Sequence, residues 1–445
     1  MSALGFTDSN SVVARRLYQL HGYLSAPNYR MLQYIVHYRN PLKPGFADNC
    51  VSVIAEIAYR LIAPVVLAAG VGYFYVWKAL NLRQIGKITG KALVLILTAE
   101  AIIFLVHLAA YLAQRKKYIH VRGSKNAQEV SKESITLASW NIAAFPSGLA
   151  YARPIWQRFD KIVEKIRNMD ADIVVLQECL VDSRLPEAFI EQFKDQYAHF
   201  FIHIGPHAFG PESGLLIMSK CAVSNFDFEF FTNRSSTQFN INRGFATLEA
   251  KAQRDGLPFA VIGTHMDARM DMDQNGHQLD NSIGSENRKK QLLQIQRKAT
   301  QVLCKDQFVI LAGDTNINMK DRKARQETGI ESVLIHPFYV RGEDDRIDPI
   351  NGTCTDIFKM LWRGRISQKL EDIEWHIDQI ALIRRYNKNC RENQPDFNPD
   401  TTLTDRRILH AYDDRTTCSD ALSDHQIVVA RYNSASLVHD KKDLT

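Results

Sequence analysis

The chain has 445 residues, of which 45% are hydrophobic and 23% charged, and its formal net charge at pH 7 is +6. This length exceeds one ordinary hydrophobic core, so we expect two parts, and the composition is that of a globular protein. The small positive charge does not distinguish a lipid partner from a nucleic acid. Seven scattered cysteines without a C-x-x-C pair argue against a disulfide framework and a zinc site, and favour a reducing compartment.

Residues 1–47 form the first predicted segment, and they contain no cleavable signal peptide. Between Val12 and Tyr38 arginines alternate with tyrosines and leucines. This pattern suits an amphipathic helix at a membrane–water boundary, where tyrosine is anchored and arginine meets headgroups. It suits equally well a helix packed on the rest of the protein, and the sequence favours neither.

Two apolar runs, Leu61–Trp77 and Ala92–Ala113, occupy the second predicted segment, residues 48–117. A membrane span needs about 20 apolar residues, and the second run reaches that length. We therefore predict two membrane helices, with Glu100 and His107 turned toward the partner helix. Basic residues on both flanks favour a membrane protein with its catalytic domain on the cytosolic side. A hairpin that enters only one leaflet of the membrane is the alternative topology.

A polar stretch, residues 118–133, is predicted to be a linker, and residues 434–445 a polar tail. Between them, residues 134–433 alternate short β-rich runs with helical patterns such as Ile155–Asn168 and Glu286–Leu303. This alternation predicts an α/β domain built on sheets.

Residues able to bind metal or carry protons stand at the ends of these β-runs. One alone is usually turn chemistry, but a series of six favours a single site. The members are Asn141, Glu178, His265, Asp314, Asp378 and His425.

These side chains suit the hydrolysis of a phosphate ester. Mg²⁺ prefers oxygen ligands and keeps several waters, so Glu178 and Asn141 would be enough to hold it. Asp314 and His425 are candidates to orient and deprotonate a water molecule. Asn316 and His265 would bind phosphate oxygens. The sequence shows no nucleophilic serine or cysteine motif.

The series "SWN", "VVLQE", "GTHMD", "AGDTN", "HIDQI" and "SDH" resembles the endonuclease/exonuclease/phosphatase superfamily over residues 134–433. The resemblance implies a four-layered α/β sandwich, with two facing sheets flanked by helices, and a Mg²⁺ site in which Mn²⁺ can substitute. It implies the following roles: Glu178 and Asn141 as metal ligands, Asp424 near the metal, His265 on the phosphate, Asp314 with Asn316 on water and phosphate, and Asp378 orienting the general base His425.

Within the superfamily, "NIAAFP", "LQECLVD", "ESGLLIMSK" and "SENRKKQLLQI" are similar to neutral sphingomyelinases, some of which also carry two hydrophobic segments before the catalytic domain. These enzymes often have a lysine where this chain has Arg243, which we predict either to bind substrate or to be a surface residue. Inositol 5-phosphatases usually have an aromatic residue where Ala312 stands.

The resulting prediction is a membrane-anchored, Mg²⁺-dependent phosphodiesterase that hydrolyses sphingomyelin to ceramide and phosphocholine. Its expected partners are sphingolipid or phospholipid membranes, with an anionic lipid as a candidate activator and no nucleic acid. The alternatives are a membrane-tethered nuclease, a phosphoinositide phosphatase and a non-catalytic lipid-binding scaffold.

Overall fold

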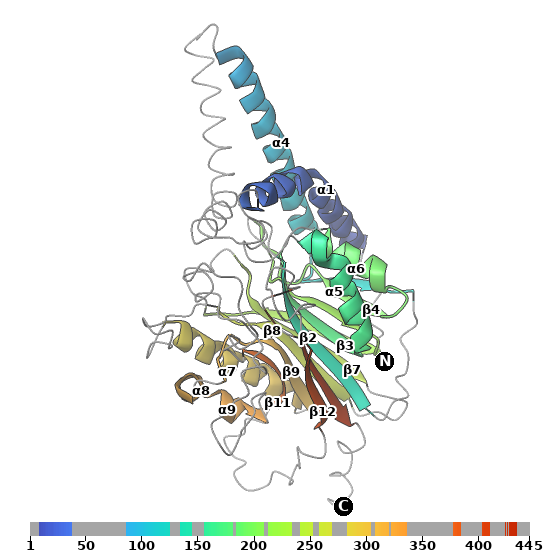
Figure 1. Cartoon of the computed structure of the whole chain (residues 1–445), viewed down its shortest axis with the longest axis vertical. Coiled ribbons are helices and arrows are strands. Elements are labelled where there is room, and N and C mark those ends of the chain that lie inside the picture. Colours follow the sequence, from blue (N-terminus) through green and yellow to red (C-terminus); the bar gives the residue numbers. More distant parts are fainter. Residues whose placement is uncertain are drawn as a thin grey trace, which may run out of the picture.

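A computed structural model shows two helices standing above a domain of two β-sheets (Figure 1). The residues that the structure describes are 9–37, 86–124, 134–144, 155–180, 184–208, 212–233, 241–251, 258–268, 283–303, 308–319, 322–335, 377–383, 403–409, 423, 425 and 427–433.

The first sheet has seven strands in the order β1-β4-β5-β3-β2-β13-β12. Their bounds are β1 Ile119–Arg122, β4 His199–Ile202, β5 Leu216–Ser219, β3 Ile173–Cys179, β2 Ser134–Ala144, β13 Ile427–Asn433 and β12 Leu403–Leu409. The second sheet has six strands in the order β10-β11-β9-β8-β7-β6. Their bounds are β10 Leu334–Ile335, β11 Asp378–Ile383, β9 Phe308–Asp314, β8 Pro258–His265, β7 Gly244–Lys251 and β6 Val223–Phe230.

Three hydrophobic clusters hold these sheets and the helices in four layers. The middle cluster joins the facing sides of the two sheets, with Leu137 and Val175 from one and Val261 and Ile310 from the other. The outer side of the first sheet is covered by α5 (Ile155–Met169) and α6 (Leu185–Phe193), and the outer side of the second by α7 (Ile283–Leu303), α8 (Arg322–Thr328) and α9 (Ile330–Val333). The predicted four-layered α/β sandwich is confirmed.

The connections explain how the strand ends meet. β2 and β3 run parallel with α5 between them in the chain, and β8 and β9 run parallel with α7 between them. A parallel pair needs such a crossover, and its two carboxyl ends lie at the same edge of the sheet. Both parallel pairs therefore end at one edge of the sandwich, where residues from the two sheets come together.

The predicted linker, residues 118–133, begins instead with a strand. Ile119 and Val121 of β1 are buried against the sandwich, while His120 and Arg122 alternate with them, and the strand pairs antiparallel with β4. This alternation over four residues is too short to stand out from the surrounding polar sequence.

The predicted membrane localisation is wrong. In the part of the chain that the structure describes, no helix is both long and apolar enough to cross a membrane. The second apolar run lies in α4 (Gly86–Ala113), which packs against α1 (Ser9–His37) and the sandwich: Ala110 is fully buried, and His107 Nε2 lies 2.9 Å from the carbonyl oxygen of His207. Hydropathy reports only how strongly the side chains avoid water. Part of this apolar run is buried against the rest of the protein. The first run, Leu61–Trp77, lies outside the described residues.

Candidate active site

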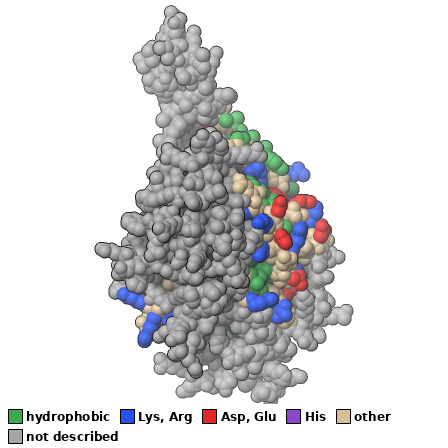
Figure 2. Space-filling view, in the orientation of Figure 1, with side chains coloured by type: hydrophobic (Ala, Val, Ile, Leu, Met, Phe, Trp, Pro, Cys, Tyr) green, Lys and Arg blue, Asp and Glu red, His purple; other side chains and the backbone are tan. Residues whose placement is uncertain are grey.

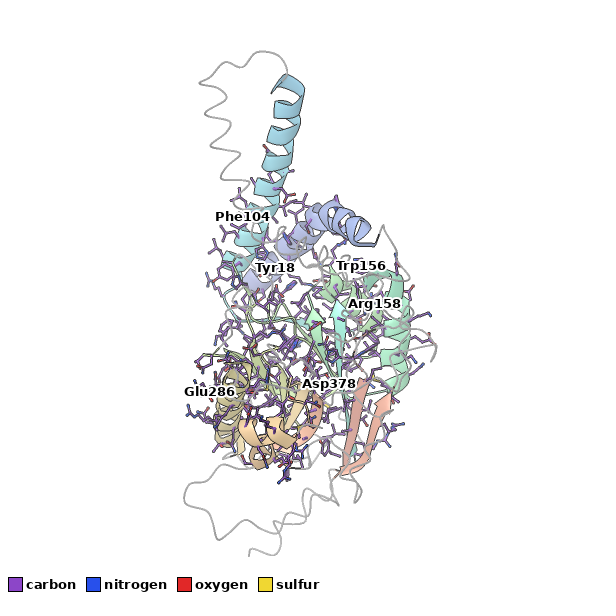
Figure 3. The ribbon with its side chains drawn as sticks, turned by 60° about the vertical axis from the view of Figure 1, so that its left-hand side comes forward. Tyr18, Phe104, Trp156, Arg158, Glu286 and Asp378 are labelled. Atoms are coloured by element: carbon purple, nitrogen blue, oxygen red, sulfur yellow. The ribbon has the colours of Figure 1, made fainter. Side chains whose placement is uncertain are left out.

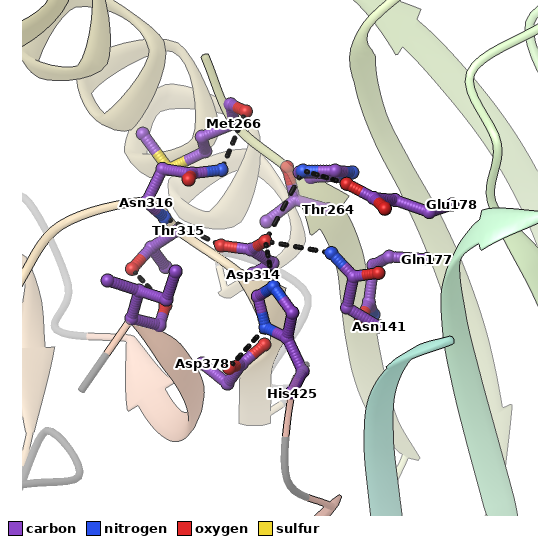
Figure 4. A network of polar contacts seen from close by, with 12 residues as sticks. Asn141, Gln177, Glu178, Thr264, Met266, Asp314, Thr315, Asn316, Asp378 and His425 are labelled. Carbon is purple, nitrogen blue, oxygen red and sulfur yellow. Dashed lines mark hydrogen bonds and ion pairs between the residues drawn. The ribbon is translucent and has the colours of Figure 1, made fainter. Parts of the chain in front are cut away.

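Asp314 is the centre of a buried polar network at the edge where the parallel strands end (Figure 4). It is the last residue of β9 and stands in register with His265, the last residue of β8, and with Asp378, the first residue of β11. Its Oδ2 atom accepts a hydrogen bond from Asn141 Nδ2 at 3.1 Å and lies 3.3 Å from His265 Nε2. Asn141 belongs to β2, so this contact joins the two sheets.

The environment of Asp314 makes it a weak acid for an aspartate. Burial, and then the negative charge of Asp378, raise its pKa from 3.8 to about 6. The charge of His425 and the hydrogen bonds from the Asn316 backbone (2.9 Å, to Oδ1) and from Asn141 oppose this rise. A carboxylate with a pKa near the working pH can both accept and return a proton.

His425 and Asp378 form a buried pair beside Asp314. His425 Nδ1 lies 2.8 Å from Asp378 Oδ2, and its Nε2 lies 3.8 Å from Asp314 Oδ2. An Nδ1–H that donates to a carboxylate makes Nε2 the nitrogen that can accept a proton, which is the arrangement of a general base.

Two residues that sequence reasoning gave no role fix the backbone of His425. Ser423 Oγ donates to the carbonyl of Asn141 at 2.6 Å and accepts the backbone N–H of His425 at 3.1 Å. Trp140 Nε1 donates to the carbonyl of His425 at 3.1 Å. Ser423 lies in the motif "SDH" and Trp140 in the motif "SWN", so their positions in the sequence could have identified them as part of the site.

His265 is buried and held neutral. Burial lowers its pKa well below 6.5, and the positive charges of Arg243 and His425 lower it further. Its Nε2 lies 3.7 Å from Glu178 Oε1, so it connects Glu178 to Asp314. At neutral pH this imidazole can donate one hydrogen bond to an oxygen without adding charge.

Arg243 is a buried cation whose nearest charges are those of the site. Its side chain is 4% exposed, and burial lowers its pKa while Glu178, Asp314 and Asp267 oppose that shift. Within the described part of the chain, its Nε and Nη1 atoms have no hydrogen-bond partner. A buried guanidinium left with open donors is costly and suits a site that receives an anion. Its burial excludes the surface-residue alternative.

Asn316 lies beside Asp314, and its amide already has a partner. Its Nδ2 donates to the carbonyl of Met266 at 3.2 Å, which ties the ends of β8 and β9 together. The predicted site residues Asn141, Glu178, His265, Asp314, Asn316, Asp378 and His425 are thus brought into one network (Figure 4). Asp424 lies outside the described residues.

Glu178 and Asn141 suit a hard divalent cation. They bring a carboxylate and an amide oxygen, which Mg²⁺ prefers, and Glu178 is the part-exposed member of the network. Asp314, Asp378 and His425 also bring ligand atoms within 4.8 Å of one another, but their mutual pairing gives them an acid–base arrangement. The donor set therefore fits the metal that the sequence predicts.

Left-handed backbone marks this corner. Glu178 (φ 59°), Ala143 (φ 46°) and Asn316 (φ 51°) all adopt it without being glycine. Such residues are strained and need support, and they gather at functional sites. Arg158 of α5 supports Ala143: its Nη1 donates to the carbonyl of Ile142 at 2.7 Å and its Nη2 to that of Ala143 at 2.6 Å.

The chain is similar to a known protein family and to several solved structures. A family model described as the Endonuclease/Exonuclease/phosphatase family matches residues 138–428. No curated protein matches the chain. Among solved structures, SmcL is 17% identical with a TM-score of 0.44, and the match covers 67% of this chain and 99% of the SmcL chain. The beta toxin from Staphylococcus aureus is 17% identical with a TM-score of 0.47, covering 66% and 99%. TDP2 from Caenorhabditis elegans is 16% identical with a TM-score of 0.43, covering 69% and 100%.

Proposed function

The chain belongs to the endonuclease/exonuclease/phosphatase family, whose members are hydrolases that act on phosphodiester bonds, and from this premise we propose that it hydrolyses sphingomyelin to ceramide and phosphocholine. One observation carries the proposal: the site combines a general-base pair, His425–Asp378, and an oxygen donor set with the buried cation Arg243, whose Nε and Nη1 have no hydrogen-bond partner among the described residues.

The balance of charge favours a substrate with one negative charge and a cationic headgroup. The charges of three carboxylates, Glu178, Asp314 and Asp267, act on the buried Arg243 guanidinium, and that of Asp378 acts on Asp314. A second buried guanidinium, Arg288, donates to the carbonyl of Asp267 at 3.0 Å, so the carboxylates still outnumber the guanidinium groups. A phosphodiester carries a single negative charge, which Arg243 can neutralise. The excess of carboxylates is compatible with the positive charge of a choline headgroup. An inositol polyphosphate would add several negative charges to this negative surface.

The sequence supports the same choice. The segments "NIAAFP", "LQECLVD" and "ESGLLIMSK", which resemble neutral sphingomyelinases, surround Asn141, Glu178 and the strand β5. A nuclease would need a track of basic residues for the phosphate backbone. In the coloured part of Figure 2, which shows described residues only, Lys and Arg side chains are interspersed with Asp and Glu side chains.

In the reaction, the chain positions a water molecule and the phosphate against each other. Arg243 and neutral His265 bind phosphate oxygens, and Asp314 orients the water. His425 Nε2 takes a proton as the water oxygen bonds to phosphorus, and the bond between phosphorus and the ceramide oxygen breaks. Asp378 holds the resulting imidazolium. The proton then passes to the ceramide oxygen, which restores His425.

A divalent ion held by Glu178 and Asn141 would supply charge neutralisation at the phosphate. We propose Mg²⁺, for which Mn²⁺ can substitute. A related S. aureus beta toxin structure contains bound magnesium ions.

The test is release of phosphocholine from sphingomyelin in detergent micelles, with Mg²⁺ and with EDTA. We expect release in Mg²⁺ alone and loss of release in Glu178→Gln. Plasmid DNA and inositol lipids serve as parallel substrates. Robust nicking of DNA or release of phosphate from inositol lipids, with sphingomyelin untouched, would replace this proposal with the corresponding alternative. No turnover of any of them would favour the non-catalytic scaffold.

A further inference from the structure

The N-terminal helices dock on the sandwich through a set of aromatic rings. Tyr18 of α1 stacks on His203, which follows β4, with ring centroids 4.0 Å apart and planes 10° from parallel. His107 of α4 meets Tyr18 edge-on at 6.0 Å and lies 5.0 Å from His21 of α1. Figure 3 shows Tyr18 where α1 crosses α4 above the sheets. We call these four residues the ring cluster.

Hydrogen bonding in the ring cluster is incomplete. Within the described part of the chain, Tyr18 Oη, His107 Nδ1 and His203 Nε2 are buried without a partner. The second nitrogen of each of these two imidazoles is engaged: His107 Nε2 lies 2.9 Å from the carbonyl of His207, and His203 Nδ1 lies 2.7 Å from Glu212 Oε1. Within the ring cluster, packing rather than a complete polar network therefore holds the helices. Elsewhere on α1, Arg15 donates to both carboxylate oxygens of Glu187 on α6, at 2.7 and 2.6 Å.

The charges around the ring cluster disfavour protonation of its histidines. The titratable groups that face it are Tyr18 and His21 on α1, Tyr111 and His107 on α4, and His203 and Glu212 on the sandwich. Glu212 is the one carboxylate of this set, so it can balance one imidazolium and not three. Burial, and then the neighbouring imidazoles, lower the pKa of His21, and burial likewise lowers that of His107.

A short path leads from the ring cluster to Glu178. Next to Glu212, the backbone N–H and the hydroxyl of Ser213 both donate to the carbonyl of Ile204, at 3.0 and 2.6 Å. The carbonyl of Gly214 then accepts the backbone N–H of Cys179 at 2.9 Å. A Cβ added to Gly214 would stand 3.3 Å from Glu178 Cα, so this segment lies directly behind the strained glutamate.

We propose that the ring cluster is an acid-released latch, which docks α1 and α4 on the sandwich and, through His203, Glu212 and Gly214, keeps Glu178 in position. His203 is then a positioning residue. The docking itself is independent of the proposed function, and only the significance of Glu178 rests on it.

Proton linkage gives the expected change of the docking equilibrium constant with pH. Because the docked state lowers the pKa of His21 and His107, docking is fully stable above their undocked pKa of about 6.5 and weakens as the pH falls below it. Each histidine that must lose a proton to dock lowers the docking equilibrium constant by up to about tenfold per pH unit. Two such histidines give up to roughly 300-fold between pH 6.5 and pH 5.

Hydrogen exchange on the full-length protein in EDTA, at pH 7.5 and pH 5.0 and corrected for intrinsic exchange, measures the latch. We expect the amides of α1 and of the second half of α4 to be protected at pH 7.5 and to exchange faster at pH 5.0. The double variant His21→Gln, His107→Gln, which cannot take up these protons, should stay protected at both. Tyr18→Ala should lose protection at both, whereas Tyr23→Ala, a change at a side chain 71% exposed on the same helix, should match the wild type.

Equal protection of the wild type at both pH values, or an undiminished acid response in the double variant, would overturn the latch. The amide of Cys179 tests the connection to the site, because its partner is the Gly214 carbonyl. It should lose protection together with α1 in Tyr18→Ala. Unchanged protection at Cys179 after the helices have separated would overturn the positioning role. Neither readout involves substrate, so a failure of the sphingomyelin assay would be distinct from both.

Discussion

Replacing Asp314 by Asn should stabilise the metal-free fold at neutral pH while removing activity. Asp314 is 1% exposed, and burial followed by the charge of Asp378 raises its pKa from 3.8 to about 6. A carboxyl group whose pKa is raised by folding destabilises the native state once it ionises. The wild type therefore loses stability as the pH rises from 3.8 to about 6 and loses no more above that. A shift of about two units corresponds to about 3 kcal/mol.

A second effect of this substitution is independent of pH. Asp314 Oδ2 accepts a hydrogen bond from Asn141 Nδ2 at 3.1 Å, and an amide nitrogen at that place would face a donor. The lost hydrogen bond costs about 1–3 kcal/mol. The other oxygen can still accept the backbone N–H of Asn316. The two contributions separate because only the ionisation changes with pH.

The assay is urea unfolding of wild type and Asp314→Asn in EDTA at pH steps between 4 and 8, with the exposed Asp195 replaced by Asn as the control. The unfolding free energy of the variant minus that of the wild type should increase by about 2 kcal/mol from pH 4 to pH 6 and level off above pH 6. The control difference should stay near zero. A difference for Asp314→Asn that is flat across this range, or that decreases, would refute the reasoning that Asp314 is buried as a weak acid.

Three further substitutions test the parts around Asp314. Arg243→Met should lower kcat/KM for sphingomyelin by about 10–100-fold, as expected for the loss of hydrogen bonds to a charged group. Arg243→Lys should recover part of this activity. Equal activity of the wild type and both variants would contradict phosphate binding by Arg243. Arg158→Met removes two hydrogen bonds, to the carbonyls of Ile142 and Ala143, and should lower the unfolding free energy by roughly 2–4 kcal/mol in urea titrations; a change below 0.5 kcal/mol would show that Ala143 does not need this support. Gly214→Ala places a side chain at φ +75° and 2.8 Å from Leu180 Cδ2, so calorimetric titration should show weaker Mg²⁺ binding; unchanged affinity would mean that the Glu178 corner tolerates displacement.

The strands that place the site were predictable because their pattern is local. Buried β-runs ending in Asn141, Glu178, His265 and Asp314 stand out in the sequence, and parallel pairing brings their ends to one edge. The proximity of Asp378 to His425 followed from the family resemblance and not from spacing, since the two residues pair across 47 positions.

The supporting residues were not predictable, because their role depends on partners that no local pattern identifies. Arg158 looks like any arginine on an amphipathic helix, yet its guanidinium is buried against carbonyls of β2. Gly214 has its function only because Leu180 and Glu178 lie behind it. The apolar run in α4 was predicted to lie in lipid because hydropathy does not show whether lipid or protein covers a helix. In the structure Ala110 is buried against protein, while Leu105 and Leu112 are exposed.

The most direct test of the central claim is hydrolysis of a lipid panel by the full-length protein, wild type beside Glu178→Gln, in Mg²⁺ and in EDTA. We predict that phosphocholine is released from sphingomyelin by the wild type in Mg²⁺ alone, and that Glu178→Gln is at least 100-fold slower, roughly the contribution of one catalytic group. Release that is equal in both proteins, or hydrolysis confined to inositol lipids or DNA, would contradict the account.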